Sequence, residues 1–181
     1  MILPRQYAIT GVQENLSVIA QMLDRKTAND MSQVRVKSHP LSALKKALGS
    51  HLNGIVLLNS TSYDGSHLAP FHGLHLTSSD ARDNALIREL RQQGMQYLAA
   101  SCHNEEEIER ANSVGCDFVT ISPVEVASCH PQAVPIGWHR FEQLSALATM
   151  PTFALGGMSM EQLADAQRFG AYGVSGISDF W

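Results

Sequence analysis

Eight short runs of apolar or alternating residues recur along the 181-residue chain, and segments with helical spacing separate most of them. Most runs are rich in Val, Ile, Leu or Tyr and end at Gly, Ser, Asn or a charged residue, as buried strands do. They occupy residues 6–10, 33–37, 54–59, 73–77, 97–103, 118–124, 152–157 and 173–178. Strands that alternate with helices imply parallel βαβ units, so an α/β protein is expected.

The segments between the runs carry helix start and stop signals. Residues 104–114 begin with Asn104 as a cap, have an acidic first turn that suits the helix dipole, and end at Gly115. Residues 159–169 repeat this plan, with Ser159 as the cap. Further helices are expected at 80–93 and 138–148, weaker ones at 16–25 and 41–48, and at most a single turn at 67–70.

Eight such units favour a closed (β/α)₈ barrel, that is, a compact TIM barrel with roughly 22 residues per unit. An open doubly wound sheet is the alternative, but its usual G-x-G-x-x-G after the first strand is absent. The chain stops at Trp181, a few residues past the last run, so the final helix is expected to be short or absent. The prediction is a single barrel domain over residues 1–181.

Composition narrows the class of protein. With 44% hydrophobic residues, the chain is long enough for one domain with a core. Its formal net charge of −4 gives no basic field for nucleic acid, and no apolar run is long enough to span a bilayer. The N-terminus lacks the features of a signal peptide, and the three cysteines have no C-x-x-C spacing, so a cytoplasmic location is expected. The eight histidines form neither H-x-x-x-H nor H-E-x-x-H, which leaves a zinc site without support.

The last two predicted strands end in similar sequences, TFALGGMS and AYGVSGIS. The ends of two neighbouring strands can offer free backbone N–H groups to one anion. In a barrel, a phosphate is often held by the loops after strands seven and eight, at the catalytic face. These two strand ends are therefore expected to hold a phosphate group.

Polar side chains alternate along the second predicted strand. Gln33, Arg35 and Lys37 share one face, because side chains alternate across a strand. A half-exposed edge strand is one interpretation of this pattern. Both faces of a barrel strand are covered, however, so a row of Gln, Arg and Lys that faces the lumen needs a partner, which favours an anionic ligand.

Other polar groups follow the third, fourth and fifth strands. Asn59 and Asp80 are candidate oxygen ligands of Mg²⁺, although Asp80 is more simply explained as the N-cap of the next helix. Ser101 is placed to hydrogen-bond a ligand, whereas His103 taken alone is a weak candidate. In the long loop after the sixth strand, His130 either charges near neutral pH and faces a diphosphate or is only a loop histidine.

A set of short motifs follows the predicted strands in order: Q-x-R-x-K at 33–37, Asn59, G-x-H-x-x-x-x-D at 73–80, S-x-H at 101–103, P-V with P-x-G at 123–137, and A-x-G-G with a late I-S that ends at Ser178. Through these motifs the chain resembles thiamine phosphate synthase and its relatives, including the thiazole tautomerase branch, over nearly its whole length. Each motif is weak alone, but their joint order and spacing are specific. In that family a pyrimidine diphosphate and a thiazole phosphate are joined to give thiamine phosphate and pyrophosphate.

The resemblance implies a role for each matched residue. The Q-x-R-x-K residues would face the pyrimidine diphosphate, the Asn and Asp would lie by Mg²⁺, and the glycines with the late Ser would hold the thiazole phosphate. The candidate catalytic residues are Arg35, Lys37, Ser101 and His130; the candidate substrate-binding residues are Gln33, Asn59, Gly137, Gly156, Gly157 and Ser178; the candidate metal ligand is Asp80.

The chain departs from the family pattern around the diphosphate. Ser60 stands where the family usually has Asp after the Asn of strand three, so one Mg²⁺ carboxylate is lost. Thr77-Ser78 replace the usual Gly-Gln after the fourth-strand motif. In the loop after the sixth strand, His130 and its neighbours replace two threonines and a lysine, so a permanent cation becomes a titratable one. The catalytic His of the tautomerase branch is missing as well.

Three functions therefore stay open: an enzyme of thiamine biosynthesis or salvage, a module that binds a phosphate ligand without chemistry, and an unrelated phosphate-binding barrel. The expected ligand is a small phosphorylated heterocycle. The segments SCHNEEE and GISDFW look most like the synthase-like domain fused to a Nudix hydrolase in some bacteria, although no Nudix box occurs here. The expected partner is such a Nudix domain or a second copy of the chain, which would cover apolar surface near Phe180 and Trp181.

Overall fold

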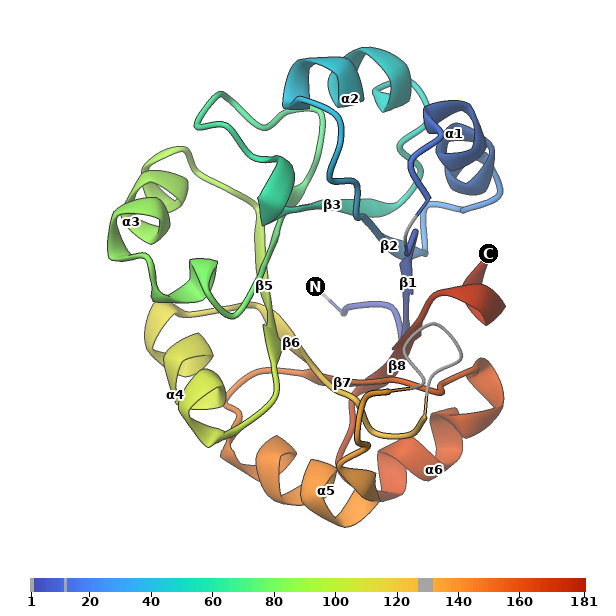
Figure 1. Cartoon of the computed structure of the whole chain (residues 1–181), viewed down its shortest axis with the longest axis vertical. Coiled ribbons are helices and arrows are strands. Elements are labelled where there is room, and N and C mark those ends of the chain that lie inside the picture. The colour runs from blue at the N-terminus through green and yellow to red at the C-terminus, as the bar shows by residue number, and fades with distance from the viewer. Residues whose placement is uncertain (1, 12, 127–131) are drawn as a thin grey trace.

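The computed structural model describes residues 2–11, 13–126 and 132–181. In these residues eight parallel strands close into a barrel in chain order, with β8 paired back to β1 (Figure 1). The strands are β1 (Gln6–Ile9), β2 (Met31–Val34), β3 (Ile55–Asn59), β4 (Gly73–Leu76), β5 (Tyr97–Cys102), β6 (Phe118–Ile121), β7 (Thr152–Leu155) and β8 (Gly173–Gly176). The predicted (β/α)₈ barrel is confirmed.

Six α-helices of the described residues form a ring outside the strands (Figure 1). They are α1 (Leu16–Asp24), α2 (Leu41–Leu48), α3 (Asn84–Gln92), α4 (Glu105–Val114), α5 (Gly137–Leu147) and α6 (Leu163–Arg168). Short 3₁₀ turns, η1 (Ser60–Ser62), η2 (Asp80–Arg82), η3 (Met160–Gln162) and η4 (Ser178–Phe180), follow β3, β4, β7 and β8. The helices bury one apolar stripe against the strands, as Ile19 and Leu23 of α1 do.

The helix signals of the sequence agree with most observed ends. The Asn104 side chain accepts a hydrogen bond from the Glu107 backbone N–H, and Gly115 ends α4 with a left-handed φ of 70°. The helix predicted at 80–93 is instead broken in two, because the Asp83 carboxylate accepts backbone N–H bonds at the start of α3. The interpretation of Asp80 as the N-cap of that helix is therefore wrong.

Strand β2 ends earlier than its alternating pattern predicts. The Arg35 N–H donates to the Thr10 hydroxyl at 2.9 Å, and the Lys37 N–H donates to the Glu14 carboxylate at 3.1 Å. Side chains from the loop after β1 thus take over the backbone groups that a longer strand would pair. Arg35 and Lys37 consequently stand at the rim of the barrel rather than inside its ladder.

Side chains fill the lumen of the barrel from its middle to the amino ends of the strands. Tyr7, Phe118 and Phe153 meet there, with ring centroids 5.1 Å apart for Tyr7 and Phe118 and 5.3 Å apart for Phe118 and Phe153. Leu3, in the segment before β1, packs against the same cluster. Since barrel interiors are packed cores, only the carboxyl end of the strands is left to hold a ligand.

The C-terminal turn η4 stands where an eighth helix would lie, as the sequence predicts. Phe180 is only 4% exposed, and the Trp181 indole N–H donates to the Ile9 carbonyl at 2.9 Å. Lys26 of the loop after α1 donates to the Phe180 carbonyl and lies over the Trp181 ring. The chain thus covers the seam between β8 and β1 with its own last residues. In the described residues, no helix is long and apolar enough to cross a membrane.

Candidate functional site

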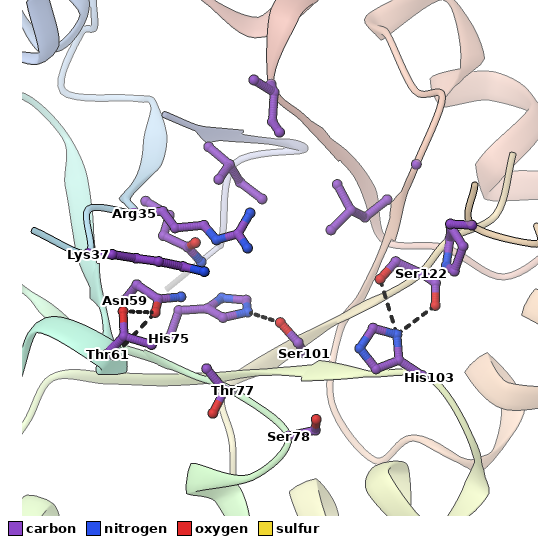
Figure 2. A pocket seen from close by; sticks show the side chains of 17 residues that line it. Arg35, Lys37, Asn59, Thr61, His75, Thr77, Ser78, Ser101, His103 and Ser122 are labelled. Carbon is purple, nitrogen blue, oxygen red and sulfur yellow. Dashed lines mark hydrogen bonds between the residues drawn. The ribbon is translucent and has the colours of Figure 1, made fainter. Parts of the chain in front are cut away.

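The carboxyl ends of the strands surround a cavity of about 410 Å³ (Figure 2). The predicted site residues that line it are Gln33, Arg35, Lys37, Asn59, Ser101 and Gly156. Asp80, Gly137, Gly157 and Ser178 lie outside this lining, and His130 lies outside the described residues. The cavity thus brings together the polar row of β2, the ends of β3 and β5, and the glycine loop after β7.

Arg35 and Lys37 extend into the cavity from the same side (Figure 2). Two side chains that carry a fixed positive charge, with polar walls around them, form a site for an anionic group. Gln33, the third member of the row, lies deeper and is only 2% exposed. The predicted common face of the three residues is confirmed, although only Gln33 lies within β2.

A chain of buried hydrogen bonds forms the floor of the cavity. The Gln33 side-chain NH₂ donates to the Tyr7 hydroxyl at 3.1 Å, and this hydroxyl lies 3.1 Å from Nδ1 of His75. Nε2 of His75 lies 2.9 Å from the Ser101 hydroxyl, a contact that Figure 2 shows as a dashed line. Burial, assisted by the Arg35 charge, lowers the pKa of His75 to about 3. His75 is therefore a neutral imidazole at physiological pH.

His103 stands on the cavity wall beside Ser101. Its Nδ1 lies 2.8 Å from the Ser122 carbonyl oxygen (Figure 2). Its backbone N–H donates to the Glu107 carboxylate at 2.7 Å. A carbonyl oxygen can only accept, so Nδ1 carries a proton in this contact. Taken alone in the sequence, His103 is a weak candidate, but its spacing two residues after Ser101, on the same face, is the signal that places it in the site.

The two candidate Mg²⁺ ligands, Asn59 and Asp80, each accept a hydrogen bond from a nearby hydroxyl group. The Ser60 hydroxyl donates to Oδ2 of Asp80 at 2.5 Å and accepts the Thr77 backbone N–H at 3.1 Å. Oδ1 of Asn59 accepts from the Thr61 hydroxyl at 2.8 Å. This cluster, called the Ser60–Asp80 clasp below, ties the loops after β3 and β4 together.

The clasp engages one oxygen of the Asp80 carboxylate together with the Ser60 hydroxyl. Mg²⁺ requires a near-octahedral set of oxygen ligands at short distance. Across the described ranges, no group of three or more His, Cys, Asp and Glu side chains is placed to hold a metal ion. The described residues therefore do not form a complete Mg²⁺ site by themselves, and an ion beside Asp80 would need further oxygens from the ligand or from water.

Steric crowding explains why two glycines, Gly156 and Gly157, follow β7. Gly156 and Gly157 have φ of +102° and +69°, and a Cβ on Gly157 would lie 2.8 Å from Cβ of Glu125 and 2.9 Å from the Val126 carbonyl oxygen. The loop after β6 thus approaches too closely for a side chain. Within the described part of the chain, no group accepts a hydrogen bond from the backbone N–H groups of Gly157 and Ser178, which makes both candidates for binding an anion.

Several lining residues lie outside the predicted set. They include His75, Thr77, Ser78, Thr61 and Ser122. His75 belongs to a matched motif, and its inward position follows from the strict alternation of β4. The others follow a strand end by one or two residues, where sequence alone does not distinguish a cavity wall from an exposed turn.

Comparisons with known proteins point to one family. The family model described as thiamine monophosphate synthase matches residues 6–180. A protein of Aquifex aeolicus strain VF5, named "Putative thiamine-phosphate synthase 2", is 30% identical over 99% of both chains. The thiamine-phosphate synthase of Koribacter versatilis strain Ellin345 is 24% identical over 98% of this chain and 89% of its own length.

Among solved structures, a thiamine phosphate pyrophosphorylase of Pyrococcus furiosus has the same fold. It aligns with a TM-score of 0.69 over 96% of this chain and 85% of its own, at 16% identity. At that identity the likeness establishes the barrel architecture alone. The sequence matches over the whole domain carry the assignment to a family.

Proposed function

Because this chain belongs to the thiamine monophosphate synthase family, we propose that its cavity binds a pyrimidine diphosphate and a thiazole phosphate and joins them to give thiamine phosphate and pyrophosphate. The observation that carries the proposal is the convergence of Arg35, Lys37 and Ser101 on a cavity that reaches Gly156 after β7. These groups supply cations and a hydroxyl at one end and a glycine loop at the other.

The charges of the cavity suit the departure of a diphosphate. When the bond between carbon and diphosphate breaks, negative charge develops on the leaving oxygens. Arg35 and Lys37 would neutralise that charge, and the Ser101 hydroxyl would donate a hydrogen bond to it. The barrel mouth would exclude water that competes for the pyrimidine carbon. No step is assigned to Mg²⁺, because the described residues do not form a complete site for it.

At the opposite end of the cavity, the thiazole phosphate would meet the loops after β7 and β8. The free backbone N–H groups of Gly157 and Ser178 are the donors proposed for it, beside the lining residue Gly156. Backbone donors bind a phosphate without a charged side chain, as helix N-termini and glycine loops do elsewhere. The thiazole nitrogen would then lie between the two anionic ends, where the new bond must form.

One observation favours a second function, a binding module without catalysis. The Ser60–Asp80 clasp occupies the place of the metal ligands that the family resemblance implies. A barrel that binds thiamine phosphate but does not turn over would then serve another protein, for which a Nudix hydrolase is the proposed partner. In that case the ligand would be held and presented rather than made.

A direct assay separates these functions. The purified chain is incubated with the pyrimidine diphosphate and the thiazole phosphate, and released pyrophosphate is measured, while thiamine phosphate binding is measured by calorimetry. Release of pyrophosphate establishes the synthase, and binding of thiamine phosphate without release supports the binding module. If neither release nor binding is found, both functions are overturned. Arg35→Met is expected to weaken thiamine phosphate binding about 10- to 100-fold, since it removes charged hydrogen bonds. Arg88→Met, on the exposed side of α3, is the matched control.

A further inference from the structure

The hydrogen-bond chain below the cavity joins two residues that the ligand would touch. Gln33 and Ser101 line the cavity, while Tyr7 lies beneath it, fully buried. His75 is 1% exposed and stands between Tyr7 and Ser101. In such a buried place every donor needs an acceptor, since an unsatisfied polar group is costly. The direction of each hydrogen bond in the chain is therefore linked to that of the next.

The direction follows from Gln33. Its NH₂ group donates to the Tyr7 hydroxyl, so this hydroxyl must give its own proton to the remaining neighbour, Nδ1 of His75. The neutral imidazole then carries its proton on Nε2 and donates it to the Ser101 oxygen. Ser101 is left with its O–H free for the cavity. Gln33, with its NH₂ turned to Tyr7, is left with its carbonyl oxygen for the cavity.

The opposite direction requires all members to change together. If the Gln33 amide turned over, its oxygen would accept from Tyr7, the imidazole proton would move to Nδ1, and Ser101 would donate back to Nε2. The cavity would then meet an NH₂ group at Gln33 and an acceptor at Ser101. A ligand that offers a donor to Gln33 thus selects the state in which Ser101 donates.

We propose that Gln33, Tyr7, His75 and Ser101 form a relay that couples recognition of a ring amino group at Gln33 to recognition of an oxyanion at Ser101. Tyr7 and His75 are positioning residues in this relay, because they act through the two that touch the ligand. The ligand class is an amino-substituted heterocycle together with a phosphate or diphosphate. This inference rests on the proposed function for the ligand, but the relay itself is a property of the free protein.

The free protein is tested first, by the ¹⁵N signals of the histidine side chains, with His75→Gln to assign His75. In the wild type, His75 is expected to be a single Nε2–H tautomer with a hydrogen-bonded Nδ1 at neutral pH. In Tyr7→Phe the ring stays but the donor to Nδ1 is gone, so the fixed tautomer is expected to be lost. Tyr63→Phe removes a hydroxyl that bonds Glu89 away from the cavity and is expected to change nothing at His75. A wild-type His75 that is cationic or protonated on Nδ1 overturns the relay.

The coupling is tested with two probes, 4-aminopyrimidine and inorganic pyrophosphate. Saturating pyrophosphate is expected to tighten 4-aminopyrimidine binding about fivefold or more in the wild type and in Tyr63→Phe. The gain is expected to disappear in Tyr7→Phe, and also for pyrimidine, which lacks the amino group. Equal gains in wild type and Tyr7→Phe would overturn the coupling. If neither probe binds the wild type, the proposed function fails, and the His75 signals alone decide whether the relay exists.

Discussion

At the scale of single residues, the site depends on the burial and protonation of three polar side chains in the barrel lumen. His75 is kept neutral because it is buried and faces the Arg35 charge. The same burial raises the pKa of Tyr7 above its ordinary value, so its hydroxyl stays protonated. Ser101 is half-buried and faces both this network and the cavity. The positive charge of the site thus comes from Arg35 and Lys37 at the rim, whereas the buried residues of the floor set the direction of the hydrogen bonds.

Burial of His75 makes stability depend on pH. Its folded pKa of about 3 lies below the ordinary value of 6.5, so between these limits the unfolded chain binds the proton that the folded chain refuses. The free energy of unfolding is therefore expected to fall as pH drops below about 6.5, by at most about 1.4 kcal/mol per pH unit from this group. Urea titrations at pH 7, 6 and 5 measure this slope.

The control for this prediction is an exposed histidine. His139→Gln removes a side chain that is 84% exposed and is expected to leave the slope unchanged, whereas His75→Gln is expected to reduce it. Carboxylates with lowered pKa, such as Glu14 and Asp30, lose their stabilising effect only at lower pH. An equal slope in His75→Gln and the wild type would show that His75 is not the group responsible.

The clasp gives a prediction about metal. Ser60→Asp would place a second carboxylate beside Asp80, and two like charges at that distance favour either a proton or a divalent cation. Pyrophosphate binding to this variant is expected to become Mg²⁺-dependent, with an affinity gain of about tenfold in Mg²⁺ over EDTA. Ser60→Ala is the matched control and should show no such gain. Calorimetry in both buffers measures it, and a variant indifferent to Mg²⁺ would count against the clasp as a replacement for metal ligands.

At the scale of elements, the loops after the strands decide where the site residues stand. Several loops are tied to a neighbouring segment. The loop after β1 bonds to the end of β2 through Thr10 and Glu14, and the loop after β3 bonds to that after β4 through the clasp. The glycine loop after β7 packs against the loop after β6 in the same way. These ties hold the cavity rim on a rigid scaffold, as binding sites require.

The packing of the glycine loop is open to a paired test. Gly157→Ala and Gly94→Ala both put a side chain at φ near +70°, but a Cβ on Gly94 would meet nothing within 4 Å. Gly94→Ala is therefore expected to cost about 1 kcal/mol of backbone strain, and Gly157→Ala about 1–3 kcal/mol more, from its clash with Glu125 and Val126. Urea denaturation gives both values. Equal losses would mean that the loop after β6 yields without cost.

At the scale of the whole molecule, the last residues of the chain cover the seam where β8 pairs with β1. Phe180 lies within the outer apolar cluster, and a Cβ on Gly176 would lie 2.4 Å from its ring. The apolar surface that suggested a second subunit is thus partly covered by the chain itself. Assembly into an oligomer stays a prediction, and light scattering tests it.

Truncation of this closing side chain is expected to be costly. Phe180→Ala should lower the free energy of unfolding by about 3–5 kcal/mol, as for other buried aromatic residues. Leu147→Ala, where the side chain is 45% exposed, should change it by less than about 1 kcal/mol. A loss at Phe180 no larger than that at Leu147 would mean that η4 does not act as the eighth cover of the barrel.

Much of the fold could be read from local patterns. Capped helices such as α4 and buried strands such as β5 have strong signals within ten or so residues. Strand ends were less accurate, because the ladder stops where another segment takes its backbone groups, as Thr10 does for Arg35. The role of Asp80 could not be predicted for a similar reason, because its carboxylate is bound by Ser60, 20 residues earlier in the chain.

The sequence by itself determined the eight alternating units, the shared face of Gln33, Arg35 and Lys37, and the family, because each depends on spacing along the chain. Only the tertiary structure decided which polar groups are free for a ligand. It joined Tyr7 to His75 across 68 residues, placed His103 on the cavity wall, and bonded the Asp80 carboxylate to the Ser60 hydroxyl. The physical reason is that a polar group's function depends on whether its hydrogen bonds are already made, and its partners come from strands distant in sequence.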